Sequence, residues 1–350
     1  MMSALWFSIL DVSTLGFGTL GFHQGLVLVL AAGLDRLVGD PWGWPHPVQG
    51  IGWVISQASR GIFRLKLPPL AERGLGMLLG LGIIVGSGIA GWGIVHLAQR
   101  VHPALGMGSE VILLASCFAG RSLRQAAEDV LVPLEAGDIP TAQGRLALYV
   151  GRDTATLPEA DIRRAVLETV SENATDGVLA PLFYALVGAL LPVGSLPVTL
   201  AYKAVSTLDS MVGYREAPYT HLGWFSARCE DGLTWLPCRL TVLTTALLSG
   251  QPGHVLRLCR RDAPADPSPN AGWSECAYAA ALGVQLGGRN TYRGQVKEKP
   301  LLGDAVQPIT GDRILQALAL TRRAALLWLA LGVAFLTLQT WLRLRLASVI

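Results

Sequence analysis

Residues 75–97 read LGMLLGLGIIVGSGIAGWGIVHL and contain no Asp, Glu, Lys or Arg. A membrane-spanning helix needs about 20 apolar residues to cross about 30 Å of hydrocarbon, and this stretch is long enough. Its many glycines would weaken a helix in water, but in lipid they let neighbouring helices approach closely. The stretch therefore predicts a membrane span packed tightly inside a helical bundle.

The whole chain has the composition of a membrane protein. Of its 350 residues, 51% are hydrophobic and 15% are charged, and the mean hydropathy is +0.43. Ordinary soluble domains carry about 25% charged residues. A second clear span is predicted over residues 324–342, and less regular spans are expected near residues 22–38, 178–201 and 233–249. We therefore expect about four or five spans.

Two of these stretches are interrupted by proline. Pro192 and Pro197 break residues 178–201, which predicts either one kinked span or two half-helices. Pro237 and Arg239 interrupt residues 233–249, which suits a helix lying along the membrane interface. The basic loop after residue 60 favours the cytoplasm, whereas the arginines on both sides of residues 324–342 favour neither side.

Two polar regions, residues 99–177 and 202–323, are too long to be simple connectors. Their apolar residues recur with helical spacing, and no strand alternation is long enough to predict a sheet. We therefore predict an all-α, polytopic integral membrane protein that forms a single domain over residues 1–350. The chemistry is expected in the two polar regions.

Several classes of protein are excluded by charge and cysteine usage. The net charge of +3 and the lack of an arginine-rich run argue against nucleic-acid binding. The five cysteines form no C-x-x-C pair, so we expect them to pack in the interior and not to bind zinc or form disulfides. The absence of Lys or Arg before Arg36 argues against a secretory signal peptide.

Acidic residues recur every four positions in ETVSENATDGVLAPLFYAL, residues 168–186. Glu168, Glu172 and Asp176 would share one face of a helix, where their charges repel one another. One interpretation is a Mg²⁺ site formed by these three carboxylates, with Asn173 adding or orienting a ligand. The other is a solvated helix face that pairs with arginines at 163 and 164.

A second candidate site is LDRLVGDPWGWPHPVQGIG, residues 34–52. Its prolines and glycines predict a rigid turn at the membrane surface. Asp35, Asp40 and His46 lie on this turn, which would suit ligand binding. The alternative for His46 is a hydrogen bond that only stabilises the turn.

Two further segments contain charged residues in apolar or glycine-rich surroundings. In AYKAVSTLDSMVGYR, Lys203 and Asp209 lie near an apolar run, where each needs a partner or a ligand, and Arg215 follows shortly after. In the second, Asn270 begins a turn before a helix of small residues, and a basic, glycine-containing loop follows. Such a loop suits phosphate, although no P-loop motif is present. The basic residues of this loop are Arg289, Arg293, Lys297 and Lys299.

Six ordered blocks between residues 34 and 300 together resemble the CbiB/CobD family of cobalamin biosynthesis. The chain departs from the family pattern mainly at Cys229, Glu230 and Cys238, so the two cysteines are given no role. The blocks are LDRLVGDPWGWPHPV, GRDTATL, ETVSENATDGVLAPLFYAL, AYKAVSTLDSMVGYR, ARCEDGLTWLPCRLT and SPNAGWSECAYAAALGVQLGG.

The resemblance implies an adenosylcobinamide-phosphate synthase, an ATP-dependent amide ligase of the inner (plasma) membrane. Such an enzyme joins a propionate carboxylate of adenosylcobyric acid to (R)-1-amino-2-propanol or its O-phosphate, with the active site facing the cytoplasm. The implied cofactors are ATP and Mg²⁺. The implied partners are the corrinoid, the aminopropanol and the lipid bilayer, with other late-pathway membrane enzymes or a second copy as further candidates. A transporter and a non-catalytic membrane sensor are the alternatives.

On this hypothesis, Glu168, Glu172 and Asp176 bind Mg²⁺, and His46 or Asp40 acts as the base that deprotonates the amine. Basic residues would bind phosphate groups, and other polar residues of the blocks would contact substrate. The expected binding residues are Arg152, Asp153, Lys203, Asp209, Arg215, Asn270, Arg289 and Lys297.

Overall fold

The computed structural model of the protein describes residues 17–41, 43 and 46–347. Helices dominate, as predicted, and several of them begin with proline at the first helical position, where the missing N–H costs no hydrogen bond. The helices of the first half of the chain are α2 (Phe17–Leu37), α3 (Pro47–Arg64), α4 (Pro69–Val101), α5 (Pro103–Ala115), α6 (Gly120–Glu135), α7 (Ile139–Leu146) and α8 (Glu159–Asn173). The π-helix η1 (Ala174–Leu179) follows, and then α9 (Ala180–Ala189), α10 (Ser195–Val212), α11 (Trp224–Leu248), α12 (Pro252–Asp262), the 3₁₀ turn η2 (Ala263–Ala265), α13 (Ala271–Leu282) and α14 (Gly311–Ala347).

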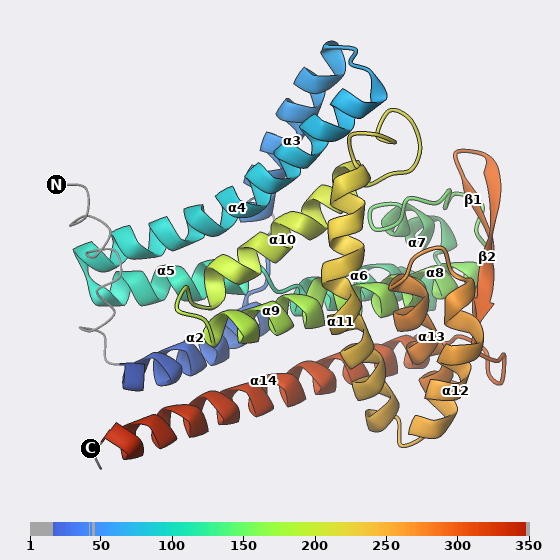
Figure 1. Ribbon diagram of the computed structural model, residues 1–350. Coiled ribbons are helices and arrows are strands. Elements are labelled where there is room, and N and C mark those ends of the chain that lie inside the picture. The colour runs from blue at the N-terminus through green and yellow to red at the C-terminus, as the bar shows by residue number, and fades with distance from the viewer. Residues whose placement is uncertain (1–16, 42, 44–45, 348–350) are drawn as a thin grey trace.

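The long apolar helices form an elongated bundle that occupies one end of the molecule (Figure 1). Helix α4 packs against α5 and α10, and α2 packs against α14. The glycines of α4 allow the close approach that the sequence predicts. A Cβ built at Gly88 would lie only 3.1 Å from the backbone oxygen of Pro197 in α10. This prediction is therefore confirmed.

Three helical stretches in the described residues are long and apolar enough to cross a membrane, against the four or five spans expected. Pro69–Val101 and Gly311–Leu346 contain the two spans predicted most clearly. The third, Pro103–Glu135, was wrongly assigned to the polar region 99–177. Its apolar part, α5, is short, and only the continuation into α6 after a break at residues 116–119 makes the stretch long enough.

The other predicted spans are different in form. Residues 178–201 form two helices, α9 and α10, which are joined at Gly194, where φ is +82°. The half-helix alternative is therefore the correct one. Residues 22–38 belong to α2, and residues 233–249 to the second half of α11, which continues through Pro237. Neither helix is among the three candidate spans.

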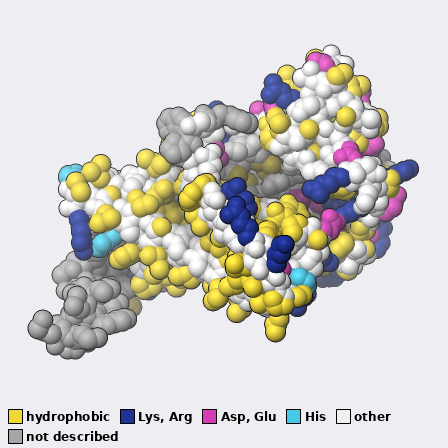
Figure 2. Space-filling model, turned by 90° about the horizontal axis from the view of Figure 1, so that it is seen from above, with side chains coloured by type: hydrophobic (Ala, Val, Ile, Leu, Met, Phe, Trp, Pro, Cys, Tyr) yellow, Lys and Arg dark blue, Asp and Glu magenta, His cyan; other side chains and the backbone are white. Residues whose placement is uncertain are grey.

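The opposite end of the molecule contains α7, α8, α12, α13 and a β-hairpin (Figure 1). A hydrophobic core formed by α6, α8, α11, α12, α13 and the first half of α14 holds this end together. Figure 2 shows one face of the molecule, on which acidic and basic side chains gather toward this end, while many hydrophobic side chains are exposed along the apolar bundle. Four of the five cysteines are buried, as expected for packing residues.

The hairpin corrects the prediction that no sheet is present. Strands β1 (Leu286–Tyr292) and β2 (Gln295–Leu302) pair antiparallel, with Asn290 opposite Lys297 and Arg289 opposite Glu298. Gly287 and Gly288 have φ near +86° and +85°, and Arg293 and Gly294 form the turn with positive φ. The strands lacked alternation because glycines and charged residues occupy both faces of an exposed hairpin.

Candidate functional site

Glu168 lies in a closed ion-pair cluster between α8 and the hairpin. Its Oε2 atom accepts a hydrogen bond from Arg152 Nη2, and its Oε1 atom accepts from the backbone N–H of Gly287 at 3.0 Å. Arg164 Nη1 lies 3.3 Å from the same Oε1 atom. The side chains of Glu168 and Arg152 are only 2% and 7% exposed. Both predicted site residues are therefore already paired with each other.

The same cluster fastens the hairpin to α8. Arg152 Nη1 donates to Asn290 Oδ1 at 2.9 Å, and Arg164 Nη2 donates to the backbone oxygen of Arg289 at 3.0 Å. Glu168 has two guanidinium partners and a backbone N–H, so its charge is compensated without a metal. The alternative of a solvated, arginine-paired face is right about Arg164, but Glu168 is buried and not solvated, and Arg152 is its second partner.

Arg163, the other arginine proposed as a partner of the row, points elsewhere. It pairs with Glu159 and Glu135, and its contact to Glu135 Oε1 is 3.1 Å. Regular helix ends at Asn173, and Asp176 lies in the wider turns of η1. Glu168, Glu172 and Asp176 therefore do not form one straight row of an α-helix.

Glu172 and Asp176 belong to a second group of carboxylates that the sequence predicted only in part. Asp209 of α10 and Glu230 and Asp231 of α11 complete this group, which we call the carboxylate cluster. Its members are half-buried and interact electrostatically across four structural elements. The cluster lies where α8, η1, α10 and α11 meet.

Burial and mutual repulsion raise the pKa values in the carboxylate cluster. Burial, followed by repulsion from Asp231 and Glu172, raises the pKa of Asp209 to about 6. Burial and then repulsion from Asp209, Asp231 and Glu172 raise the pKa of Glu230 to about 7, although a hydrogen bond from Thr234 opposes the shift. The pKa values of Glu172 and Asp176 are raised for the same reasons. Such a group favours a bound cation or protonation near neutral pH.

Lys203 links the carboxylate cluster to Asp40, which lies in the second candidate segment. Its positive charge acts on both Asp176 and Asp40. Asp40 accepts a hydrogen bond from Ser122 Oγ at 2.8 Å and lies 3.2 Å from His46 Nε2. Burial alone would raise the pKa of Asp40, but the hydrogen bonds from His46 and Ser122 and the charge of Lys203 hold it below its ordinary value. Two predicted segments therefore meet here.

His46 is held on both sides. Its Nδ1 atom accepts a hydrogen bond from the backbone N–H of Val48 at 3.2 Å and so caps α3, while Nε2 faces Asp40. Asp35 accepts hydrogen bonds from the backbone amides of Gly120 and Arg121 at the start of α6. The expected stiffness of this turn thus has a structural basis in two helix N-termini.

Lys299 of β2 lies on the other side of Glu172. Its Nζ atom is 3.1 Å from Glu275 Oε1, and Glu275 is completely buried in α13. Burial raises the pKa of Glu275 to about 8, opposed by Lys299. Burial would lower the pKa of Lys299, but Glu275, Glu168 and Glu172 raise it. The Oε2 atom of Glu275 has no hydrogen-bond partner among the described residues.

Sequence reasoning missed Glu230, Asp231 and Glu275. Glu230 and Asp231 were visible in the block ARCEDGLTWLPCRLT, but a pair of acids in a helix resembles an ordinary solvated face. Glu275 stands alone among small residues in α13, which is a detectable signal, because a lone buried carboxylate needs a partner. Only the tertiary structure brings Lys299 to it.

Several predicted binding residues are engaged in local structure. Asp153 accepts hydrogen bonds from the backbone N–H groups of Arg293 and Gly294, at 3.0 and 2.7 Å, and so holds the hairpin turn. Asn173 donates to the backbone oxygen of Thr169 within α8. Buried Asn270 donates to the backbone oxygen of Asp231 at 3.0 Å, which places the start of α13 beside the carboxylate cluster.

The remaining predicted phosphate-binding residues lie at the surface. Arg215 and Arg289 are exposed, and Lys297 Nζ pairs with Glu216 at 2.7 Å. Arg215 still acts electrostatically on Asp231, so it lies at the edge of the carboxylate cluster. Of the basic residues predicted from the sequence, Lys203 interacts with acids of two segments, Asp40 and Asp176, and Lys299 with Glu275 of α13 and with Glu168 and Glu172 of α8.

The carboxylate cluster could hold Mg²⁺ with one or two carboxylates, but not as a complete protein site. Among the described residues, no three His, Cys, Asp or Glu side chains converge as a ready-made metal site. Magnesium, however, is commonly held by one or two carboxylates together with water and substrate phosphates. Glu172 and Asp176, whose raised pKa values reflect burial and repulsion from neighbouring acids, have the oxygen donors for such a site.

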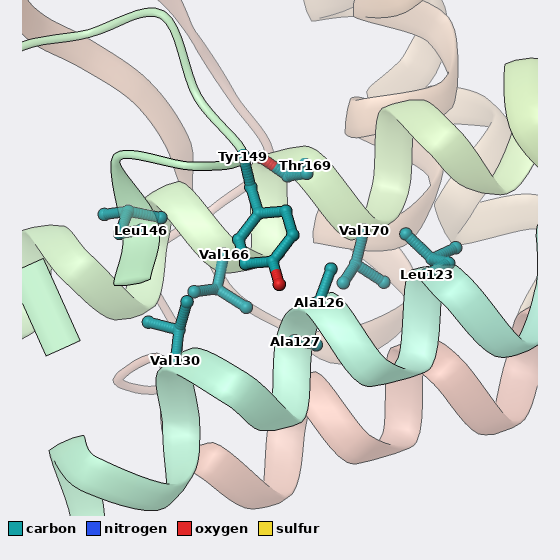
Figure 3. Close-up of a pocket in the computed structure, with 9 residues that line it drawn as sticks. All are labelled: Leu123, Ala126, Ala127, Val130, Leu146, Tyr149, Val166, Thr169 and Val170. Carbon is teal, nitrogen blue, oxygen red and sulfur yellow. The ribbon is translucent and has the colours of Figure 1, made fainter. Parts of the chain in front are cut away.

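The small cavity in Figure 3 is not a substrate site. It lies between α6, α8 and the residues around Tyr149, and its walls are apolar except for Tyr149 and Thr169. Tyr149 donates its hydroxyl hydrogen to Asp129 Oδ2 at 3.0 Å. With a volume of about 10 Å³, the cavity holds one water molecule at most.

Comparison with known proteins identifies the family. A family model described as CobD/Cbib protein matches residues 28–321. The cobalamin biosynthesis protein CobD of Synechocystis sp. is 56% identical over 308 residues, which cover 88% of this chain and 90% of that protein. CobD of Klebsiella pneumoniae is 43% identical over 316 residues, covering 88% of this chain and 95% of that protein. CbiB of Salmonella typhimurium is 42% identical over 305 residues, covering 86% and 94%.

No solved structure matches the chain. The family model and the three relatives each span most of its length, and they confirm the resemblance drawn from the six sequence blocks. The chain therefore belongs to the CobD/CbiB family of cobalamin biosynthesis proteins.

Proposed function

We propose that the protein is an ATP-dependent amide ligase that acts in cobalamin biosynthesis as an adenosylcobinamide-phosphate synthase. It would join a propionate carboxylate of adenosylcobyric acid to (R)-1-amino-2-propanol or its O-phosphate. The observation that carries the proposal is the carboxylate cluster, with Lys203 on one side and Lys299 on the other. The names of the relatives support the pathway, and they give no support to a transporter or a sensor.

The reaction explains why acidic and basic groups are needed together. A carboxylate is a poor acyl donor, and MgATP supplies the phosphoryl group that converts it to an acyl phosphate. In the proposal, Glu172 and Asp176 contact the metal, and Lys203 neutralises negative charge on the transferring phosphate. Lys299 faces Glu172 from β2 and is suited to bind a carboxylate or phosphate of the substrate. Glu168 is left out because Arg152 and Arg164 already pair with it.

The base that deprotonates the amine is assigned from pKa values. An effective general base has a pKa near the working pH. The pKa of Asp40 lies below its ordinary value, and both nitrogens of His46 are engaged, so this pair suits a positioning role. Burial and neighbouring acids raise the pKa of Glu230 to about 7. We therefore propose Glu230 as a candidate base beside the expected His46 or Asp40, with the displaced phosphate leaving as the amide bond forms.

The proposal places the active site on the cytoplasmic side of the inner membrane, where ATP is found. The polar end of the molecule carries the carboxylate cluster and lies at one end of the apolar bundle (Figure 1). Four basic residues, Arg60 and Arg64 at the end of α3, Lys66 in the loop and Arg73 at the start of α4, favour the cytoplasm by the positive-inside rule.

The direct test is Glu172→Gln, assayed as amide formation in membranes over a Mg²⁺ titration. We expect a rate loss of about 100-fold or a shift of the Mg²⁺ midpoint, because a ligand of the metal loses its charge. The matched control is Glu159→Gln, an exposed acid on the same helix. Unchanged rate and metal dependence in Glu172→Gln would remove this residue from the site.

A test in cells addresses the reaction itself. A strain that requires cobinamide is given cobyric acid and this chain. Growth is expected with the wild-type chain and with Glu159→Gln, and not with Glu172→Gln. Failure of the well-expressed wild-type chain to support growth would refute the proposed reaction.

A further inference from the structure

A second, partly open cavity lies where the apolar bundle meets the opposite end of the molecule. It has a volume of about 540 Å³ and is lined by α2, the start of α6, η1, α9 and α14. Its walls are largely hydrophobic and include Phe118, Leu182, Leu318, Leu326 and Leu329. None of the acidic residues of the carboxylate cluster lines it. This size and lining suit a small apolar ligand or a single hydrocarbon chain.

The two helices that frame the cavity run antiparallel. Gly21 of α2 faces Leu336 and Thr340 of α14, and Gly25 faces Val333, so chain positions rise on one helix as they fall on the other. The end of α2 therefore lies beside the start of the apolar run of α14. Figure 1 shows the same side-by-side arrangement of the two helices.

Each of the two helices carries an arginine where the end of α2 lies beside the start of the apolar run of α14. Arg36 follows the apolar run of α2, and Arg322 precedes the apolar run of α14; both line the cavity. A charged residue that ends an apolar run marks the boundary between hydrocarbon and headgroups. The lining residues of α14 run from Leu315 to Leu329, so the cavity crosses this boundary, and its part beyond Arg322 lies in the apolar layer.

The charge at the cavity mouth is positive. Two other charged residues line it: Arg124 pairs with Glu128 at 2.6 Å, and Asp35 contributes one carboxylate, whose Oδ1 atom is buried without a hydrogen-bond partner among the described residues. Three arginines therefore face a single acid in the lining. The side chains of Arg36 and Arg322 have no carboxylate partner among the described residues, and both residues are exposed. Two unpaired guanidinium groups above an apolar chamber are complementary to an anionic amphiphile.

We propose that this cavity binds an anionic phospholipid, with one acyl chain inside it and the headgroup phosphate in contact with Arg36 and Arg322. A soluble phosphate would not use the hydrophobic walls, and a zwitterionic lipid would leave net positive charge at the mouth. Guanidinium groups bind phosphate oxygens with two parallel hydrogen bonds, which fixes the headgroup at the boundary. The site goes beyond the proposed amide ligase activity and does not depend on it.

The test uses the full chain reconstituted with defined mixtures of phosphatidylglycerol and phosphatidylcholine, followed by native mass spectrometry of retained lipid. We expect preferential retention of phosphatidylglycerol. Each of Arg36→Gln and Arg322→Gln is expected to weaken retention about tenfold, because a charge-assisted hydrogen bond is lost. The control is Arg343→Gln, on the same helix but at its far end, which should retain lipid as the wild type does.

A second variant tests the apolar part of the cavity and not the two arginines at its edge. Ala325→Phe places a large side chain at a cavity-lining position on the apolar side of Arg322 and is expected to exclude the acyl chain while leaving both arginines in place. Equal retention of the two lipids, or unchanged retention in Ala325→Phe and in the double arginine variant, would overturn the proposal. Release of the lipid by added corrinoid would also overturn it, because the cavity would then belong to the substrate.

The outcome is separable from that of the proposed reaction. Glu172→Gln is expected to retain phosphatidylglycerol as the wild type does, because this residue does not line the cavity. A chain that retains lipid but forms no amide would refute the reaction alone. A chain that forms amide but shows no lipid preference would refute the lipid site alone.

Discussion

Replacing Glu168 with Gln separates the two roles that the acidic row could have. The side chain is 2% exposed and contacts Arg152, which is 7% exposed, and Arg164, which is 12% exposed. The substitution keeps the shape and removes the negative charge, so two guanidinium groups lose their shared partner. We expect loss of stability and not loss of metal binding.

The size of the effect follows from burial. Removing one partner of a buried ion pair costs about 3–5 kcal/mol, because the other charge remains in a poorly solvated place. Glu159 of the same helix pairs with Arg163 but is 48% exposed, and such an exposed pair contributes about 0–1 kcal/mol. With about 2 °C per kcal/mol for a chain of this size, Glu168→Gln should unfold about 5–10 °C lower, and Glu159→Gln within about 2 °C of the wild type.

The assay is thermal unfolding of the purified protein in a mild detergent, together with amide formation at a temperature well below both transitions. Folded Glu168→Gln should show the Mg²⁺ dependence of the wild type. An unfolding temperature equal to that of Glu159→Gln, with a shifted Mg²⁺ midpoint, would refute the structural role and return Glu168 to the metal site.

Three further predictions concern Glu275, Asp153 and Gly88. Burial raises the pKa of Glu275 from 4.5 to about 8, so the folded state holds a proton that the unfolded state releases. Stability should therefore fall as pH rises from about 5 to about 8. In a plot of unfolding temperature against pH, Glu275→Gln should flatten this slope, and an unchanged slope would contradict the prediction. Asp153→Ala should free the hairpin turn and increase trypsin cleavage after Arg293 several-fold, since two hydrogen bonds worth about 1 kcal/mol each are lost. Equal cleavage rates in the variant and the wild type would show that the turn is stable without Asp153. Gly88→Leu should lower the unfolding temperature by separating α4 from α10, and the same change at Gly86, which faces open space, is the control.

The membrane part of the fold was largely predictable because its signals are local. Two spans could be predicted from length and hydropathy alone, in the glycine-rich run 75–97 and in the run 324–342. The break between α9 and α10 could be predicted from Pro192 and Pro197. The span over Pro103–Glu135 was missed because it depends on two helices joining end to end. The hairpin was missed because its strands are stabilised by contacts to α8 and α13 and not by their own pattern.

The candidate site was predictable in its segments but not in its pairings. Glu172, Asp176, Lys203 and Asp209 were singled out from sequence, and the structure brings them together. Glu168 looked equivalent to Glu172 because both lie on α8 with helical spacing. What distinguishes them is Arg152, which lies 16 residues earlier in the chain, and Asn290 on the hairpin. Such partners depend on the tertiary fold and are not encoded in spacing.

The π-helix η1 joins α8 to α9 and changes the direction in which the side chains of the second helix point relative to those of the first. Regular α-helix advances about 100° per residue, and the wide turn at Ala174–Leu179 accommodates extra chain without ending the rod. On one side of it, α8 presents Glu168 to the hairpin; on the other, α9 presents Leu182 to the apolar cavity. Deleting one residue from this turn would make the helix regular and rotate one partner surface away from its neighbour. Homologous chains should therefore tolerate length changes poorly at this turn and more readily in the exposed residues 214–218 between α10 and α11.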